Sequence, residues 1–214
     1  MSIDQSIFEG SQRLGIRLPE EAVARLAAYL TLLDRWNRAY NLTAVRDPEA
    51  MVVRHILDSL SILPWLEGPQ VLDVGSGAGL PGIPLAIARP EHEFCLLDSN
   101  GKRTRFLTQV AIELRLSNVG VVRGRVEEYR PETPLLFNSV VSRAFSTLAD
   151  MVMSAGHLCA PEGRLLAMKG VFPDDELARL PSGYAVVGVY PLHVPHLEAE
   201  RHLVHLAPAS ASRD

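Results

Sequence analysis

The sequence lacks the features that mark secreted, membrane-spanning and disulfide-stabilised proteins. Its 214 residues include only two cysteines, Cys95 and Cys159, which lie far apart and match no metal-binding spacing. Residues 1–20 contain charged residues throughout and no apolar run of the signal-peptide type. The charge-free stretch from Val74 to Ala88 contains four glycines and two prolines, so it does not predict a membrane span. These absences predict a cytoplasmic, globular protein.

Lysine is also scarce, because only Lys102 and Lys169 among the 21 basic residues are lysines. The net charge is −4, but residues 101–169 contain 10 Lys and Arg against 6 Asp and Glu. A local excess of positive charge can contact phosphate groups even in an acidic protein. A solvated charged surface is the alternative, and the charge count alone favours it.

The hydrophobic pattern changes near residue 70. Before it, apolar residues recur at helical spacing from Glu20 to Trp36 and again from Asp47-Pro48 to Pro64. After it, short apolar runs alternate with helical segments, which predicts a parallel sheet with right-handed crossovers. We expect strands at 71–74, 94–97, 119–122, 139–142 and 164–168, and helices at 81–88, 102–116 and 148–158.

The end of the chain breaks this alternation. Residues 184–190 and 201–207 read as two strands with no helix between them, which predicts an antiparallel hairpin at the sheet edge. The predicted fold is therefore α/β, a doubly wound, mostly parallel sheet with an antiparallel last strand and an N-terminal helical extension. We expect a helical cap at 1–66, a sheet domain at 67–207 and a flexible tail at 208–214.

The clearest chemical signal is the glycine-rich loop that follows the first strand. Gly77, Gly79 and Gly82 match the spacing G-x-G-x-x-G, which is typical of nicotinamide dinucleotide sites. Asp98 ends the second strand, 23 residues after Gly75, where an acid can bind ribose hydroxyls. A match of this kind is weak by itself, and a plain tight turn is a further interpretation.

Three features favour S-adenosylmethionine over a dinucleotide. Asp73 lies inside the strand, where dinucleotide motifs usually have an apolar residue. The glycines are followed by Leu80-Pro81, a sequence suited to an amino-acid tail rather than to a pyrophosphate. The predicted antiparallel last strand is typical of class I methyltransferases. The sequence therefore predicts a methyltransferase.

The residues after the fourth strand narrow the chemistry. They read Ser142-Arg143-Ala144-Phe145, without the Asn/Asp-Pro-Pro-Tyr type of motif that grips an exocyclic amine. No cysteine accompanies the predicted loops for covalent attack on a pyrimidine. A ring nitrogen such as guanine N7 fits better, because its lone pair is already nucleophilic. Catalysis could then consist of alignment and exclusion of water, with no Asp, Glu or His acting as a base.

Motifs along nearly the whole chain, from about residue 8 to residue 206, resemble those of the RsmG (GidB) family. This resemblance is carried by Trp36-Asn37, Asn41–Thr43, His55–Leu60, Asp73–Pro84, Leu97–Ser99, Lys102-Arg103, Arg125–Glu127, Ser142–Phe145 and Met168–Gly170. It implies a class I methyltransferase that methylates N7 of a guanine in the decoding-region loop of 16S ribosomal RNA. The implied cofactor is S-adenosylmethionine, and the implied partner is small-subunit ribosomal RNA or the small ribosomal subunit. No metal, membrane or DNA partner is expected.

The resemblance also implies site residues. It places the cofactor against Gly75 and Leu80, puts Val126 and Glu127 at the adenine and puts Arg143 near the methionine end. Gly77 and Gly79, from the glycine spacing, are also expected at the cofactor. Asp98 is expected to accept both ribose hydroxyls, and Arg143 is the candidate catalytic residue. Lys102, Arg103 and Lys169 are the candidate contacts to RNA phosphates.

Several of these residues have simpler interpretations. Glu127 can be part of a solvated acidic pair, and Arg143 can form an ion pair with Asp73 or Glu127. For His55 and Asp58, polar contacts between helices are favoured over catalysis. A non-catalytic RNA-binding module and an NAD-dependent oxidoreductase remain alternatives. The sequence leaves open whether the substrate is free RNA, a precursor particle or the assembled subunit.

Overall fold

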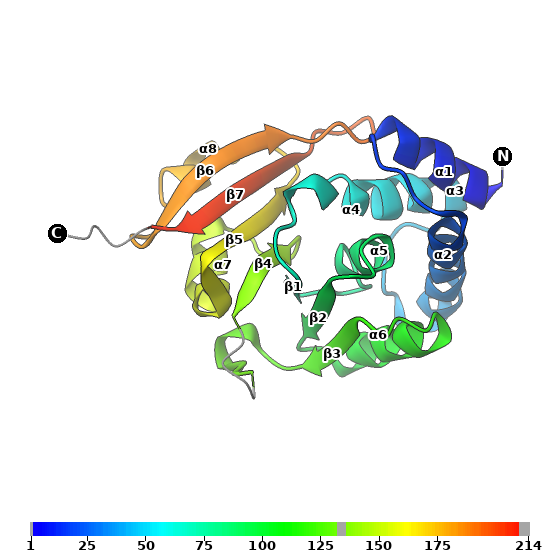
Figure 1. The fold of residues 1–214 in the computed structure, drawn as a ribbon, viewed down its shortest axis with the longest axis horizontal. Helices are drawn as coiled ribbons and strands as arrows, with labels where there is room; N and C mark the ends of the chain where they lie inside the picture. Colours follow the sequence, from blue (N-terminus) through cyan, green and yellow to red (C-terminus); the bar gives the residue numbers. More distant parts are fainter. Residues whose placement is uncertain (1, 132–135, 210–214) are drawn as a thin grey trace.

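A seven-stranded sheet forms the centre of the molecule (Figure 1). The computed structural model describes residues 2–131 and 136–209. The strands are β1 (Gln70–Val74), β2 (Glu93–Asp98), β3 (Val119–Arg123), β4 (Phe137–Ser142), β5 (Cys159–Lys169), β6 (Tyr184–Pro191) and β7 (His202–Pro208). Their order across the sheet is β3-β2-β1-β4-β5-β7-β6, and β7 runs antiparallel to both of its neighbours. The predicted doubly wound sheet with an antiparallel hairpin at one edge is confirmed.

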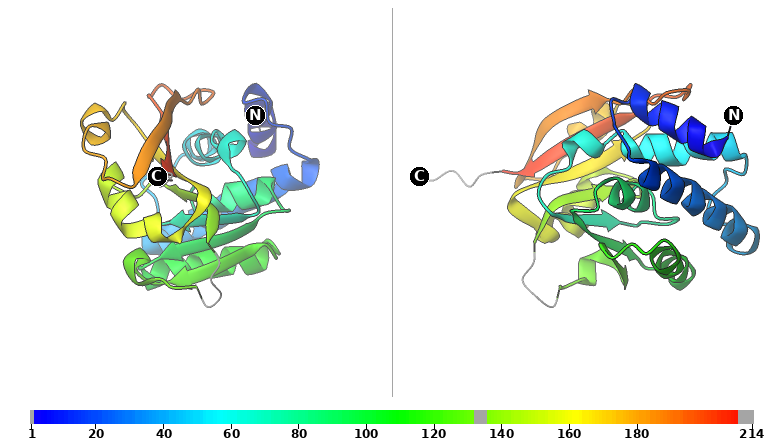
Figure 2. Two further views of the ribbon diagram at one scale, coloured as in Figure 1. Left: turned by 60° about the vertical axis from the view of Figure 1, so that its left-hand side comes forward. Right: turned by 45° about the vertical axis from the view of Figure 1, so that its right-hand side comes forward.

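Helices cover both faces of this sheet (Figure 2). The α-helices are α1 (Ile3–Arg13), α2 (Glu20–Tyr40), α3 (Pro48–Met51), α4 (Asp58–Leu60), α5 (Gly82–Ala88), α6 (Gly101–Glu113), α7 (Leu148–Ala155) and α8 (Asp174–Leu177). A π-helical turn, η1 (Val52–Leu57), joins α3 to α4, and 3-10 turns lie at η2 (Leu63–Trp65), η3 (Val126–Glu128) and η4 (Gly156–Leu158). None of the described helices is long and apolar enough to cross a bilayer.

Alternate residues of each strand enter two different hydrophobic clusters. Val71 and Val141 pack on one face with the helices α1 to α6, while Leu72 and Val140 pack on the other face with α7. This alternation is the period-2 geometry of a strand, and burial on both faces explains why these strands read as continuous apolar runs. The N-terminal helices therefore share one core with the sheet.

The second predicted N-terminal helix is not continuous. Asp47 caps α3 by accepting a hydrogen bond from the N–H of Ala50, as its position before Pro48 suggests. After Met51 the chain widens into the π-helical turn and returns to α-helical geometry only at Asp58. Apolar spacing does not distinguish a π turn from an α-helix over six residues, so the local pattern contains no indication of it.

Other boundaries shift by a few residues. The helix predicted to end at Leu116 ends at Glu113, because Arg115 adopts a left-handed conformation with φ of 53°. The fifth strand begins at Cys159 rather than at Arg164. Helix α1 falls within the predicted helical cap, whereas α8 was not expected from the sequence. Residues 210–214, most of the predicted tail, lie outside the described residues.

Candidate active site

A cleft of about 370 Å³ lies at the carboxyl ends of the parallel strands. It falls in the size range of small-molecule sites and lies where β1 separates β2 from β4, the switch point of a doubly wound sheet. It is lined by Val74, Gly75, Leu97, Asp98, Ser99, Arg103, Gly124, Arg125, Val126, Glu127, Ala144 and Phe145. Four of the predicted cofactor residues, Gly75, Asp98, Val126 and Glu127, thus meet in one cleft.

Gly75 begins the glycine loop, where no other residue type fits. Its φ is +69°, and an added Cβ would lie 2.6 Å from the Cβ of Ala144. Its N–H donates to the carbonyl oxygen of Leu97 at 2.8 Å. The loop after β1 and the loop after β4 therefore touch here, and at Gly75 itself a ligand in the cleft would meet backbone rather than a side chain.

Asp98 is a buried acceptor at the end of β2. One oxygen accepts from the N–H of Gly77 at 2.9 Å, and the other accepts from the N–H of Asn100 at 2.8 Å. The guanidinium of Arg103 lies 3.4 Å from the first oxygen and also lines the cleft. Oδ1 can accept a further bond, whereas Oδ2 could accept one only if Arg103 moved aside, so a ribose hydroxyl is first expected at Oδ1. It also fixes the glycine loop against β2.

Gly79 and Leu80 do not line the cleft, and neither does Gly77, whose N–H donates to Asp98. Gly79 has φ of +91°, and an added Cβ would lie 2.6 Å from the side chain of Ile83 and 2.9 Å from that of Leu107. Leu80 packs against the core on the same face of the sheet. This geometry gives Gly79 and Leu80 a role in packing the loop against α5 and α6.

Asp73 closes the other end of the loop. It is fully buried, and one of its oxygens accepts from the N–H of Gly82 at 3.0 Å. Burial raises the pKa of this carboxyl group to about 7, and the nearby charge of Arg143 acts in the opposite direction. Asp73 therefore binds the start of α5 rather than lining the cleft.

Arg143 is paired with neither of the two carboxylates considered from the sequence. Its Nη1 lies 3.2 Å from Oδ2 of Asp58, on the N-terminal part of the chain. The two residues that follow it, Ala144 and Phe145, line the cleft, so Arg143 stands at its border. Asp58 therefore takes the place that the sequence had suggested for Asp73 or Glu127.

Of the three predicted phosphate contacts, Lys102 is the one whose charged group has no partner among the described residues. It lies on the first turn of α6 and is exposed. The ammonium of Lys169 pairs with Glu176 at 2.8 Å and donates to the carbonyl oxygens of Phe145 and Ser146 at 3.4 and 3.1 Å. Arg103 faces the cleft. An RNA phosphate would have to displace Glu176 from Lys169, whereas Arg103 contacts Asp98 through Nη1 alone and keeps exposed donor groups.

The polar residues of the N-terminal part contact one another and the sheet. His55 forms a hydrogen bond of 2.9 Å with the hydroxyl of Thr43, and burial lowers the pKa of its imidazole. Trp36 stacks on Tyr40 with ring centroids 5.3 Å apart. The His55 bond joins η1 to the connection after α2, so His55 makes a polar contact within the cap, although its partner does not lie on a helix.

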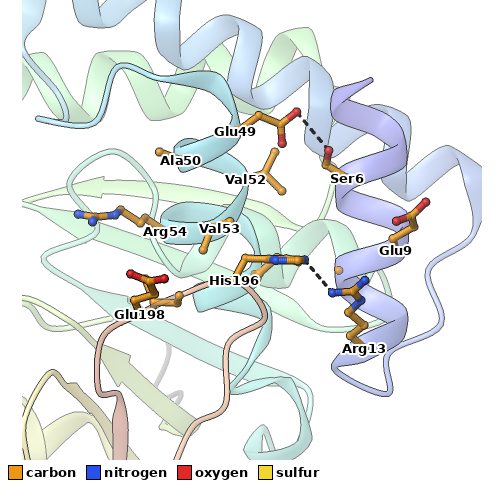
Figure 3. A pocket seen from close by; sticks show the side chains of 13 residues that line it. Ser6, Glu9, Arg13, Glu49, Ala50, Val52, Val53, Arg54, His196 and Glu198 are labelled. Carbon is orange, nitrogen blue, oxygen red and sulfur yellow. Dashed lines mark hydrogen bonds between the residues drawn. The ribbon is translucent and has the colours of Figure 1, made fainter. Parts of the chain in front are cut away.

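A larger pocket of about 590 Å³ lies away from this cleft (Figure 3). It is enclosed by α1, η1 and the connection between β6 and β7, and Arg13 bonds His196 across it at 2.9 Å. Glu49 bonds Ser6 at its other end. None of the predicted site residues lines this pocket. We therefore take the smaller cleft, and not this pocket, as the candidate active site.

Comparison with known proteins identifies the family. The sequence profile of GidB, described as rRNA small subunit methyltransferase G, matches residues 22–204. The chain belongs to the GidB family. It is 55% identical over 211 residues to the ribosomal RNA small subunit methyltransferase G of Nitrosococcus oceani, covering 98% of both chains. It is 56% identical over 201 residues to the protein of the same name from Pseudomonas aeruginosa, covering 94% of this chain and 93% of the relative.

Solved structures place the GidB chain in the class I methyltransferase fold. The glycopeptide N-methyltransferase MtfA, solved with S-adenosylmethionine, superposes with a TM-score of 0.61 at 14% identity and covers 72% of this chain and 87% of MtfA. TrmN from Thermus thermophilus gives a TM-score of 0.53 at 19% identity, covering 81% of this chain and 53% of TrmN. These likenesses confirm the predicted fold.

Sequence reasoning missed several residues at and around the candidate site. Phe145 and Arg125 line the cleft, although only their motifs were noted and no role was given to them. Arg201 reaches Asp58 from the side of β7 and had no signal in the sequence, because the contact joins segments far apart in the chain. The sequence analysis gives Arg103 a role toward phosphate alone. Its position shortly after Asp98, on the first turn of α6, could have indicated that its side chain reaches the cleft.

Proposed function

We propose that this protein transfers a methyl group from S-adenosylmethionine to N7 of one guanine in the decoding-region loop of 16S ribosomal RNA. One observation carries the proposal: family motifs far apart in the chain converge on a single cleft at the switch point of a class I methyltransferase fold. Relatives that match over nearly their whole length carry the name ribosomal RNA small subunit methyltransferase G.

The residues of the cleft fit this cofactor. Gly75 has no side chain, so a ligand can approach its backbone closely. An added Cβ would clash with Ala144 on the opposite loop. Asp98 offers buried carboxylate oxygens to the ribose, and Glu127 offers an exposed acceptor to the adenine amino group beside the apolar Val126. These assignments, like those of Gly77 and Arg143, are part of the proposal.

The reaction needs alignment more than proton transfer. S-adenosylmethionine, held by Asp98, Glu127 and the glycine loop, would supply a methyl group to the lone pair of N7, and its sulfur would leave as a neutral thioether. N7 loses no proton, so no side chain has to act as a base. Arg143, at the border of the cleft, is placed to hold the anionic end of the cofactor or the flipped-out base, since a guanidinium serves either. Phe145 helps to exclude water.

RNA is the proposed macromolecular partner, and the cytoplasm, where ribosomal RNA is assembled, is the proposed location. Lys102 lies beside the cleft on α6, exposed and without an ionic partner in the described chain, and can meet a backbone phosphate. Duplex DNA is not expected to compete.

The test is transfer of labelled methyl groups to ribosomal RNA, with the modified nucleotide mapped. Free 16S RNA, precursor particles and small subunits lacking the modification would be offered in parallel, with duplex DNA as a control. Incorporation at N7 of a single guanine is the expected result. Binding of RNA without transfer would support a non-catalytic module, and binding of NADH but not S-adenosylmethionine in calorimetry would support an oxidoreductase.

A further inference from the structure

One carboxylate joins three distant parts of the chain beside the active-site cleft. Asp58 is the first residue of α4 and has no exposed surface. Its Oδ1 accepts from Nε of Arg201 at 3.0 Å, just before β7, and its Oδ2 lies 3.2 Å from Nη1 of Arg143, just after β4. The N-terminal helices, β4 and β7 therefore meet at a single side chain.

In the cluster of Asp58, Arg143 and Arg201, the carboxylate is buried and the two guanidiniums lie closer to solvent. The side chain of Asp58 is 1% exposed, whereas those of Arg143 and Arg201 are 29% and 22% exposed. Two guanidiniums with one carboxylate leave a net positive charge toward solvent. Nη1 of Arg201 also donates to the carbonyl oxygen of Glu200. Among the described residues, Arg143 has no ion-pair partner besides Asp58.

A second carboxylate competes for Arg143. Asp73 is buried behind the glycine loop, and its Oδ1 has no hydrogen-bond partner among the described residues. The charge of Arg143 already lowers the pKa of Asp73, so the two groups lie within electrostatic reach. Without Asp58, the guanidinium would be drawn toward Asp73 and would leave its present position just before the cleft residues Ala144 and Phe145.

We propose that Asp58 is a positioning residue that holds Arg143 at the border of the cleft, braced by Arg201, and keeps it from pairing with Asp73. This inference rests on the proposed role of Arg143 toward the cofactor. In this role Asp58 would affect the reaction through Arg143, without contacting the reacting atoms itself. This role also explains why the cap and β7 meet here.

A double-mutant cycle on cofactor affinity tests the proposal, because the cycle measures whether Asp58 acts through Arg143. Calorimetry with S-adenosylmethionine would compare the wild type, Asp58→Asn, Arg143→Gln and the double variant. We expect Asp58→Asn to weaken binding about 10-fold, and to weaken it less than about 2-fold in the Arg143→Gln background. The matched control is Ser59→Ala, the next buried residue of α4, whose side chain forms no hydrogen bond within the described chain and whose loss should leave affinity within about 2-fold.

A purely structural role for Asp58 would lower affinity by the same factor in both backgrounds, and that result would overturn the proposal. So would unchanged affinity of a folded Asp58→Asn variant. If Asp58→Asn does not fold, as thermal unfolding would show, Arg201→Gln takes its place in the cycle. It should weaken binding about 3-fold in the wild-type background and leave it unchanged in the Arg143→Gln background, and additive effects would overturn the proposal.

The result of the double-mutant cycle does not depend on the result of the RNA methylation assay. A wild-type protein that binds S-adenosylmethionine but methylates no ribosomal RNA would contradict the proposed function while leaving the coupling between Asp58 and Arg143 measurable. A wild type that methylates RNA but shows no coupling would contradict the role of Asp58 alone.

Discussion

The two loops that border the cleft are held by different kinds of contact. In the loop after β1, residues 75–82, backbone N–H groups donate to nearby acceptors: Gly77 to Asp98, and Gly82 to Asp73. The loop after β4, residues 143–147, is held by ion pairs and hydrogen bonds from distant segments, Arg143 with Asp58 and Lys169 with two loop carbonyl oxygens. The first loop depends on backbone conformation, and the second depends on charges brought together by the fold.

The two loops should therefore respond differently to substitution. A side chain added to the first loop should cause a steric loss that no change of salt or pH relieves. A charge removed from the second loop should misplace side chains while the cleft itself persists. Variants of single residues in each loop can separate these two expectations.

The largest effect is expected for Gly75→Val. The new side chain would place its Cβ 2.6 Å from that of Ala144, in a backbone conformation that L-residues rarely adopt. We expect at least about 10³-fold weaker binding of S-adenosylmethionine by calorimetry, because the clash with Ala144 and the unfavourable φ would displace the two loops that form the cleft. Gly170→Ala, where an added Cβ meets nothing within 4 Å, is the control and should bind normally. Normal affinity of a folded Gly75→Val protein would exclude this loop from the cofactor site.

In the second loop, Arg143→Ala should reduce the single-turnover rate at saturating cofactor and RNA by on the order of 10²-fold, a loss typical of misplaced reactants. Arg179→Ala, an exposed arginine beyond α8, is the matched control and should keep the wild-type rate. An unchanged rate in Arg143→Ala would mean that the ion pair with Asp58 serves the fold alone.

The pH dependence of stability tests the closure of the first loop by Asp73. Burial raises the pKa of Asp73 to about 7 from 3.8, so the folded protein holds this proton more tightly than the unfolded chain. The stability contributed by the protonated group is full below about pH 4 and is lost as the pH rises through about 7. Between these values the free energy of unfolding should fall by on the order of 1–3 kcal/mol more in the wild type than in Asp73→Asn. Urea unfolding at several pH values measures this, and parallel curves would contradict it.

The smallest effects should separate Lys102 from Arg103, adjacent residues on α6. If Lys102 meets one phosphate, Lys102→Ala should lower the slope of log affinity for RNA against log salt by about 1 and leave cofactor affinity unchanged. Arg103→Ala should instead alter cofactor affinity, because its guanidinium lies 3.4 Å from Asp98 in the cleft. An unchanged salt slope in Lys102→Ala would place the RNA on another face, and an unchanged cofactor affinity in Arg103→Ala would contradict its place in the cleft.

The difference between local backbone contacts in the first loop and long-range charge contacts in the second explains what the sequence could and could not predict. The strands and the glycine loop follow from local patterns, and each observed strand overlaps the apolar run that predicted it. The meeting of Gly75, Asp98 and Glu127 follows from the rule that parallel strands end at one edge. The contacts of Arg143 and Lys169 do not follow from such rules, because their partners come near them only through the packing of the cap and of the turn after β5. The π-helical turn before α4 is also set by packing rather than by local preference.

The hydroxyl of Tyr29, on α2, donates to the carbonyl oxygen of Ala78 in the glycine loop at 2.6 Å, and the tyrosine is wholly buried. The N-terminal helices are therefore not an interchangeable module. A chimera that exchanged residues 1–66 between distant methyltransferases would have to carry over this hydroxyl, the surface it packs on and the loop it supports as one unit. During evolution, changes on α2 and changes in the glycine loop would accordingly constrain one another, although Tyr29 and Ala78 are separated by 49 positions in the chain.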